Sequence, residues 1–235
     1  MGCCNSNRPA ASLAPLTSPL PAAPNHSDSV HLLLIKAYRE KNASLALSLL
    51  SSSSPLRLKF RCKRLDKVQS FVCYLLASWT DQYTVVIEAG ALGQILELSC
   101  EDKHALSALY MMAAESAEVA QALIKLKPLD KLMLVYGRDK QTALIASLLL
   151  GLLSAYQADF AVQTVISGGL NAALNVYSDL HHFEAKRDML KAIYTILAQA
   201  RPDIPLTCVA GLSQALVQAN DVSLVRLQRL LDTSL

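Results

Sequence analysis

The stretch VIEAGALGQILELS, residues 86–99, ends one short helical pattern at small residues and starts another at a leucine. The same arrangement recurs in VISGGLNAALNVYS at 165–178 and CVAGLSQALVQAN at 208–220, and IKLKPLDKLMLVYG at 124–137 fits if Pro128 forms the turn. The leucines that start the second helices are Leu92, Leu129, Leu170 and Leu212. They lie 37, 41 and 42 residues apart. A helical period of about 40 residues predicts an alpha-solenoid, whose units bury their apolar faces only by stacking.

The composition agrees with a wholly helical protein. Of 235 residues, 52% are hydrophobic and only 17% are charged, which excludes a disordered chain. Glycines number 8 and aromatic residues make up 6%, while leucine and alanine dominate, as is typical of helices and not of sheets. Through Lys67 the chain carries ten lysines and arginines against three acids, and from Val68 twelve against sixteen. This uneven charge favours an oriented partner or surface over nucleic acid.

The stretch IEAGALGQILELS resembles the armadillo repeat, a three-helix unit with a glycine between its first and second helices. The glycine allows a sharp corner that a Cβ would obstruct. The resemblance places third helices on KHALSALYMMAAE at 103–115, KQTALIASLLLGLLSAY at 140–156 and AKRDMLKAIYTILAQA at 185–200. We therefore expect an all-α, right-handed alpha-solenoid of about five armadillo-like repeats over residues 27–235, with the first and last repeats degenerate.

The same resemblance suggests where a partner would bind. Armadillo proteins that grip extended peptides carry asparagines on their third helices, and the matching positions here are Met111, Leu152 and Thr195. None of these side chains has an amide that could clamp a peptide backbone. We therefore expect these groove candidates to receive a helix or a folded partner rather than an extended peptide. For Met111 and its neighbour Met112, core packing is the competing interpretation.

The N-terminal sequence MGCCNS matches the pattern for N-myristoylation at Gly2, with Ser6 as the required hydroxyl residue. One myristoyl chain binds a membrane only marginally, with a partition constant of about 10⁴ M⁻¹, so stable attachment needs a second signal. Cys3 and Cys4 can supply that signal as palmitoylation sites. The alternative is that the match is accidental. Residues 1–26, rich in proline, serine and alanine, are predicted to be a disordered, acylated anchor and spacer.

A basic segment, PLRLKFRCKRLDK at 55–67, precedes the regular repeats. Leu58, Cys62 and Leu65 are spaced i, i+4 and i+7, which predicts a helix with one apolar stripe. Its cations are Arg57, Lys59, Arg61, Lys63, Arg64 and Lys67. They could bind anionic lipid headgroups, at about 1 kcal/mol per cation, or an acidic protein partner, or they could simply be solvated.

No pattern in the chain indicates catalysis. Nucleophile elbows, phosphate-binding glycine loops and metal-ligand spacings do not occur, so we expect no enzyme, no metal and no cofactor. The histidines His181 and His182 are adjacent in an apparent loop, where surface histidines are far more common than metal ligands. The four cysteines outside the N-terminal pair are scattered singly among helical residues, which favours buried thiols over disulfides.

These features together predict a monomeric armadillo-type adaptor that recruits a protein partner to the cytoplasmic face of a membrane. It is similar in plan to dually acylated armadillo proteins that attach organelles to motors and tethers. Two alternatives from other classes are a nucleotide-exchange cofactor of Hsp70, since some armadillo-type proteins have that activity, and an unrecognised helical enzyme. The longest apolar run, residues 142–156, is shorter than the ~20 residues that span a bilayer, so a buried core helix is expected there.

Overall fold

The computed structural model describes residues 26–50, 55–60 and 63–200 of the chain. Within these ranges three complete three-helix repeats follow one another. The first comprises α4 (Tyr83–Glu88), α5 (Ala91–Ser99) and α6 (Lys103–Glu115). The second comprises α7 (Ala117–Lys125), α8 (Leu129–Leu134) with the 3-10 turn η2 (Val135–Gly137), and α9 (Lys140–Tyr156). The third comprises α10 (Ala158–Ile166), α11 (Gly169–Ser178) and α12 (Phe183–Ala200).

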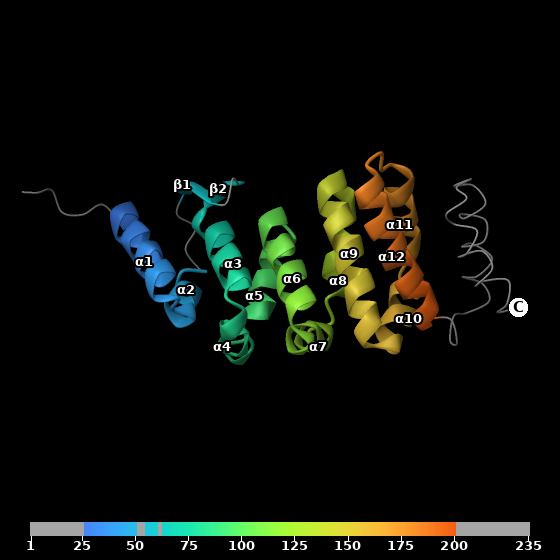
Figure 1. The fold of residues 1–235 in the computed structure, drawn as a ribbon, viewed down its shortest axis with the longest axis horizontal. Coiled ribbons are helices and arrows are strands. Elements are labelled where there is room, and N and C mark those ends of the chain that lie inside the picture. Colours follow the sequence, from blue (N-terminus) through green and yellow to red (C-terminus); the bar gives the residue numbers. More distant parts are fainter. Residues whose placement is uncertain (1–25, 51–54, 61–62, 201–235) are drawn as a thin grey trace, which may run out of the picture.

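The third helices pack on one another along the length of the molecule. Helix α6 packs between α3 (Val68–Ser78) and α9, and α9 packs between α6 and α12. Figure 1 shows these helices as a row, with α4, α7 and α10 along one edge. The all-α solenoid predicted from the sequence is confirmed. The predicted third helices at 103–115 and 140–156 match α6 and α9, and the segment 185–200 lies within α12.

Each first helix turns into its second helix through a residue with a left-handed backbone. Gly90 has φ +65° and Gly168 has φ +80°, as the armadillo resemblance implies. In the middle repeat this residue is Lys127, with φ +51°, and Pro128 follows as the N-cap of α8. The turn predicted at Pro128 is present, and because the proline ring holds φ near −65°, the preceding residue Lys127 supplies the positive angle.

Replacing Lys127 by glycine is expected to raise the free energy of unfolding by about 0.5–1 kcal/mol, because a left-handed backbone is strained for a residue with a Cβ. Gln121→Gly is the control, since Gln121 is an exposed residue within α7 and should lose about 1 kcal/mol. Urea unfolding followed by circular dichroism measures both. A lower stability for the Lys127 variant would contradict the strain argument.

The predicted basic helix at 55–67 is not a helix. The chain forms strand β1 (Pro55–Phe60) and strand β2 (Lys63–Lys67), which pair antiparallel with Leu58 opposite Leu65 and Lys59 opposite Arg64. The physical reason is visible in the sequence PLRLKF, where apolar and basic residues alternate with the period of two that a strand requires. Residues 61–62, which include Arg61, lie outside the described residues.

This hairpin stands at the chain position of a second helix. Helix α2 (Ala43–Ser48), capped by the Asn42 side chain, packs against both α3 and α4, as a first helix does. The hairpin follows α2, packs on α3, and leads directly into that third helix. Helix α1 (His26–Glu40) precedes this unit and packs on α2. The unit α2, β1, β2 and α3 is thus the degenerate first repeat that the sequence predicted. The expected last repeat, around 208–220, lies outside the described residues.

Helix α9 is the centre of the described core. Ala146, Leu150 and Leu153 are fully buried, which confirms that the long apolar run is a core helix. Gly151 lets α12 approach closely, since a Cβ on Gly151 would be 2.5 Å from the Cβ of Ala192. Among the described helices, none is both long and apolar enough to cross a membrane.

Candidate functional site

The row of third helices presents one side to the rest of each repeat and the other side to solvent. On α9 the buried side includes Ala146, Leu149 and Leu153, against which the other helices pack. Leu148 and Leu152 come from the opposite side of the helix and are half-buried. We call this solvent side of α6, α9 and α12 the third-helix face. Its outward positions are Ser107, Met111 and Ala114 on α6, Leu148, Leu152 and Ala155 on α9, and Lys191, Thr195 and Ala198 on α12.

The middle of the third-helix face is apolar. Helix α9 carries no charged residue from Gln141 to Tyr156. Two tyrosines adjoin these outward positions in the sequence: Tyr156, next to Ala155, is 38% exposed, and Tyr194, next to Thr195, is 47% exposed. Exposed aromatic rings beside half-buried aliphatic side chains are typical of protein-binding surfaces.

Bonds between neighbouring repeats fix the third helices that carry this face. The Arg138 guanidinium donates hydrogen bonds to the main-chain oxygens of Cys100 at 2.7 Å and Glu101 at 2.5 Å, which end the preceding second helix. Other contacts between repeats join Lys131 to Glu97, Lys103 to Gln141 at 3.3 Å, and Lys140 to Asp179 at 3.0 Å.

The side chain of Asp139 shows why α9 begins at Lys140. Asp139 is the N-cap of α9, and its carboxylate accepts hydrogen bonds from the hydroxyl of Thr142 at 2.5 Å and the amide of Thr142 at 2.9 Å. These bonds stabilise the charged form and lower the pKa of Asp139.

Two buried titratable groups have raised pKa values. Burial raises the pKa of Tyr136 to about 12, and its hydroxyl shares a 2.8 Å hydrogen bond with Ser147. Burial also raises the pKa of the Cys73 thiol, which forms no disulfide.

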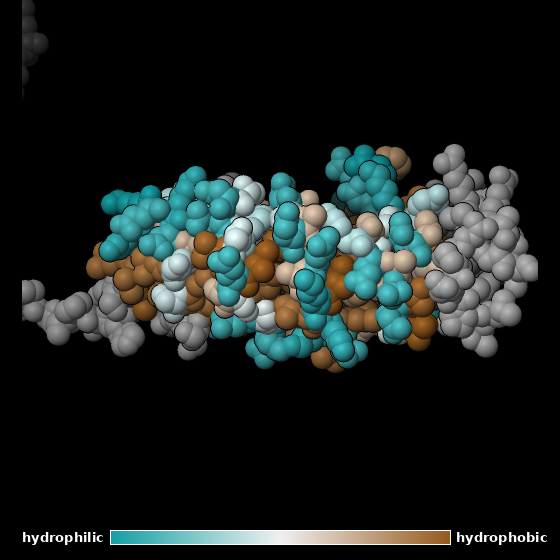
Figure 2. All heavy atoms as spheres, turned by 90° about the horizontal axis from the view of Figure 1, so that it is seen from below, coloured by the Kyte–Doolittle hydropathy of each residue, from teal (hydrophilic) through white to brown (hydrophobic). Residues whose placement is uncertain are grey.

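A second apolar surface lies at the end formed by α1 and α2. Leu32 on α1 is 65% exposed and Leu33 is 38% exposed. Figure 2 shows apolar side chains gathered at this end of the rod, while apolar and hydrophilic residues alternate along the rest of the visible edge. In the part of the chain that the structure describes, no group of three or more His, Cys, Asp or Glu residues could hold a metal ion.

Comparison with solved structures identifies the fold. The chain superimposes on the armadillo-repeats-only protein ARO from Plasmodium falciparum with a TM-score of 0.66 and 13% identity, covering 91% of this chain and 99% of that one. A designed armadillo repeat protein matches with a TM-score of 0.60 and 18% identity, covering 90% and 94%. This chain is an armadillo-type solenoid. No family model and no curated protein sequence matches the chain.

The armadillo solenoid brings the three predicted groove residues onto one face. Met111, Leu152 and Thr195 are all half-buried and lie on successive third helices, α6, α9 and α12. The hydroxyl of Thr195 donates to the carbonyl of Lys191 within its own helix, at 2.8 Å. Their role in partner binding stays a prediction.

The structure describes only some of the remaining predicted site residues. Gly2, Cys3 and Cys4 lie outside the described residues. Of the basic segment, Arg57 and Lys59 lie on β1 and Lys63, Arg64 and Lys67 on β2, at the end of the row where α3 begins. Sequence reasoning missed Arg138 altogether. Its only signal was a long basic side chain directly before the N-cap of a third helix.

Proposed function

We propose that this armadillo solenoid is a protein-binding adaptor whose partner lies along the third-helix face. The observation that carries the proposal is the apolar middle of that face, where Leu148 and Leu152 are only half-buried on a helix whose last sixteen residues carry no charge. A partner that covers Leu148 and Leu152 would bury the apolar surface that this helix leaves in contact with water. The absence of asparagine at Met111, Leu152 and Thr195 favours a partner that brings its own helix or folded surface.

We also propose that the adaptor works at the cytoplasmic face of a membrane. The support is the sequence MGCCNS, with one myristoylation site and two adjacent thiols, and the basic residues of the hairpin. Confining two binders to one surface raises their effective concentration toward the millimolar range without a new contact. Nothing in the described residues favours the Hsp70-cofactor alternative.

Proximity labelling in native cells tests both parts of this proposal. The wild type should label membrane proteins and one recurrent partner. Gly2→Ala should lose the membrane proteins, because the first acyl chain cannot be attached. Leu152→Glu should keep the membrane proteins and lose the partner by at least about tenfold, because a charge is placed in the apolar contact. The control is Leu134→Glu, since Leu134 is 72% exposed on α8, away from the third-helix face.

Three outcomes would overturn the proposal. An unchanged partner yield with Leu152→Glu, in a variant that melts at the wild-type temperature, removes the third-helix face as the binding site. Membrane labelling that persists with Gly2→Ala removes the acyl anchor. Glutamine at all six cations of residues 55–67, with unchanged binding of the acylated protein to anionic vesicles, removes lipid contact by the hairpin.

A further inference from the structure

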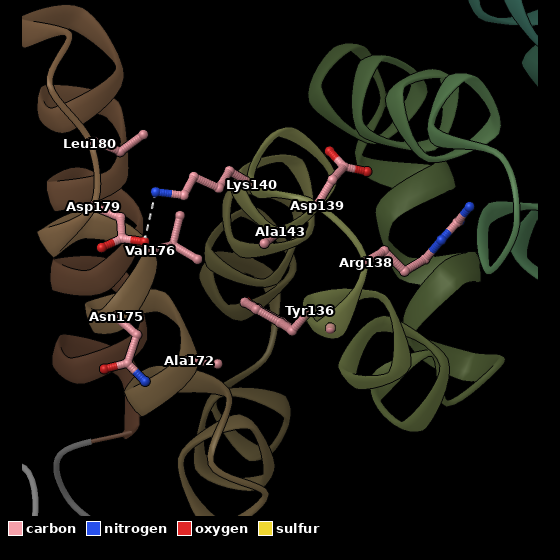
Figure 3. A pocket seen from close by; sticks show the side chains of 11 residues that line it. Tyr136, Arg138, Asp139, Lys140, Ala143, Ala172, Asn175, Val176, Asp179 and Leu180 are labelled. Carbon is pink, nitrogen blue, oxygen red and sulfur yellow. Dashed lines mark ion pairs between the residues drawn. The ribbon is translucent and has the colours of Figure 1, made fainter.

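A cavity of about 360 Å³ opens between the second and third repeats, away from the third-helix face (Figure 3). Its walls come from η2, the start of α9 and the last turns of α11. Ala143, Ala172 and Val176 supply apolar surface, and the ring of Tyr136 lies beside them. Lys140 and Asp179 cross the opening as an ion pair, with both side chains mostly exposed.

At the junction between the first and second repeats, an arginine side chain binds the end of the preceding second helix. There the Arg138 side chain, directly before the N-cap Asp139 of α9, reaches back and binds the carbonyls of Cys100 and Glu101. These carbonyls end the second helix, where the helix dipole concentrates negative charge. Arg138 is among the residues that line the cavity, but Figure 3 shows its guanidinium pointing toward that preceding repeat.

One repeat later the corresponding arginine is missing. The main-chain oxygen of His182 accepts from the amide of Lys186 at 3.0 Å, so His182 starts α12 as Asp139 starts α9. The residue before it, at the position of Arg138, is His181, which is exposed and does not line the cavity. The residues that correspond to Cys100 and Glu101 are Gly137 and Arg138, and both line the cavity. The cavity therefore lies where an arginine from the next repeat would have bound.

The chemistry of the walls suits a guanidinium group. The carboxylate of Asp179 and the side-chain amide oxygen of Asn175 offer acceptors in the cavity wall, while the Asp139 carboxylate is held by the amide and hydroxyl of Thr142. Lys140 pairs with the Oδ2 atom of Asp179, which leaves the Oδ1 atom of that carboxylate to accept from a guanidinium. The apolar walls and the Tyr136 ring fit the methylene stem and the flat face of an arginine side chain.

We propose that this cavity receives the guanidinium of an arginine presented by a protein partner. The arginine of the partner binds the segment after α8 and η2, as Arg138 binds the segment after α5. The arginine site is separate from the third-helix face and does not depend on acylation. Its test therefore succeeds or fails independently of the adaptor proposal.

Titration of the full chain with N-acetyl-arginine amide, followed by NMR of the Ala143 and Ala172 methyl groups, tests the proposal. The shifts should saturate with a dissociation constant on the order of millimolar, as expected for a single anchored side chain. N-acetyl-citrulline amide has nearly the same shape without the charge, and should bind at least about tenfold more weakly.

The variant His181→Arg places an arginine of the chain itself at the position of Arg138. It should weaken binding of the probe at least about tenfold and raise the melting temperature, because the new side chain fills the site. Asp179→Asn keeps the shape of the wall and should also weaken binding. Equal binding of arginine and citrulline probes, absence of saturable shifts, or wild-type binding by His181→Arg would each overturn the proposal.

Discussion

Gly151→Ala is expected to lower the free energy of unfolding by about 2–3 kcal/mol. The added Cβ would lie 2.5 Å from the Cβ of Ala192 and 2.6 Å from its Cα, so the backbone of α12 must move. Alanine also favours a helix over glycine by about 1 kcal/mol, which offsets only part of the clash. Since α9 and α12 both contribute to the third-helix face, the shift should also disturb the spacing of its side chains.

Gly93→Ala is the matched control for this prediction. Gly93 lies within α5, and nothing lies within 4 Å of the position that its Cβ would occupy. The same substitution should therefore stabilise the protein by about 0.5–1 kcal/mol, through helix propensity alone. Urea unfolding of both variants, followed by circular dichroism, measures the difference. Equal changes in the free energy of unfolding of the two variants would show that α9 and α12 can move apart without loss of stability.

Arg138→Met is expected to lower the free energy of unfolding by about 1–2 kcal/mol. The substitution removes two charge-assisted hydrogen bonds to the carbonyls of Cys100 and Glu101, while methionine retains much of the apolar stem. The loss stays small because the guanidinium is exposed and water can replace part of what is removed.

Two controls separate this effect from a loss of net charge. Lys125→Met removes an exposed cation at the end of α7 and should change stability by less than about 0.5 kcal/mol. Arg138→Lys keeps the charge but cannot reproduce the two-pronged contact, so it should fall between wild type and Arg138→Met. A wild-type unfolding midpoint for Arg138→Met would mean that the contact contributes nothing to the junction between repeats.

The regular part of the fold could be predicted because its signals are local. Asp102 and Asp139 are side-chain caps, α6 and α9 begin at the next residue, and an apolar pattern starts within four residues of each cap. The corner glycines are equally local, because Gly90 and Gly168 supply a backbone angle that other residues avoid. The positive φ of Lys127 at the equivalent corner was not predicted, because lysine has no sequence preference for a left-handed backbone.

The hairpin could not be predicted from the sequence, because residues 55–67 fit both the helical period of 3.6 and the strand period of 2. Leu58, Cys62 and Leu65 have helical spacing, while Leu56, Leu58 and Phe60 alternate with cations. Pairing between two strands decided the outcome, and pairing is not visible along one strand. Arg138 was missed for a similar reason, because its partners lie in the preceding repeat. The positions of Met111, Leu152 and Thr195 on one face followed from the repeat alone, whereas the identity of a partner does not.

The contacts of Arg138 reach only from one repeat to the next, and the third helices likewise pack on their immediate neighbours. Stability in such a rod is nearly a sum of local terms. A substitution at one junction should therefore lower the protection of the two repeats that meet there more than that of the others. Amide hydrogen exchange would then show the repeats losing protection one after another, and limited proteolysis would first cleave the chain at the least stable junction.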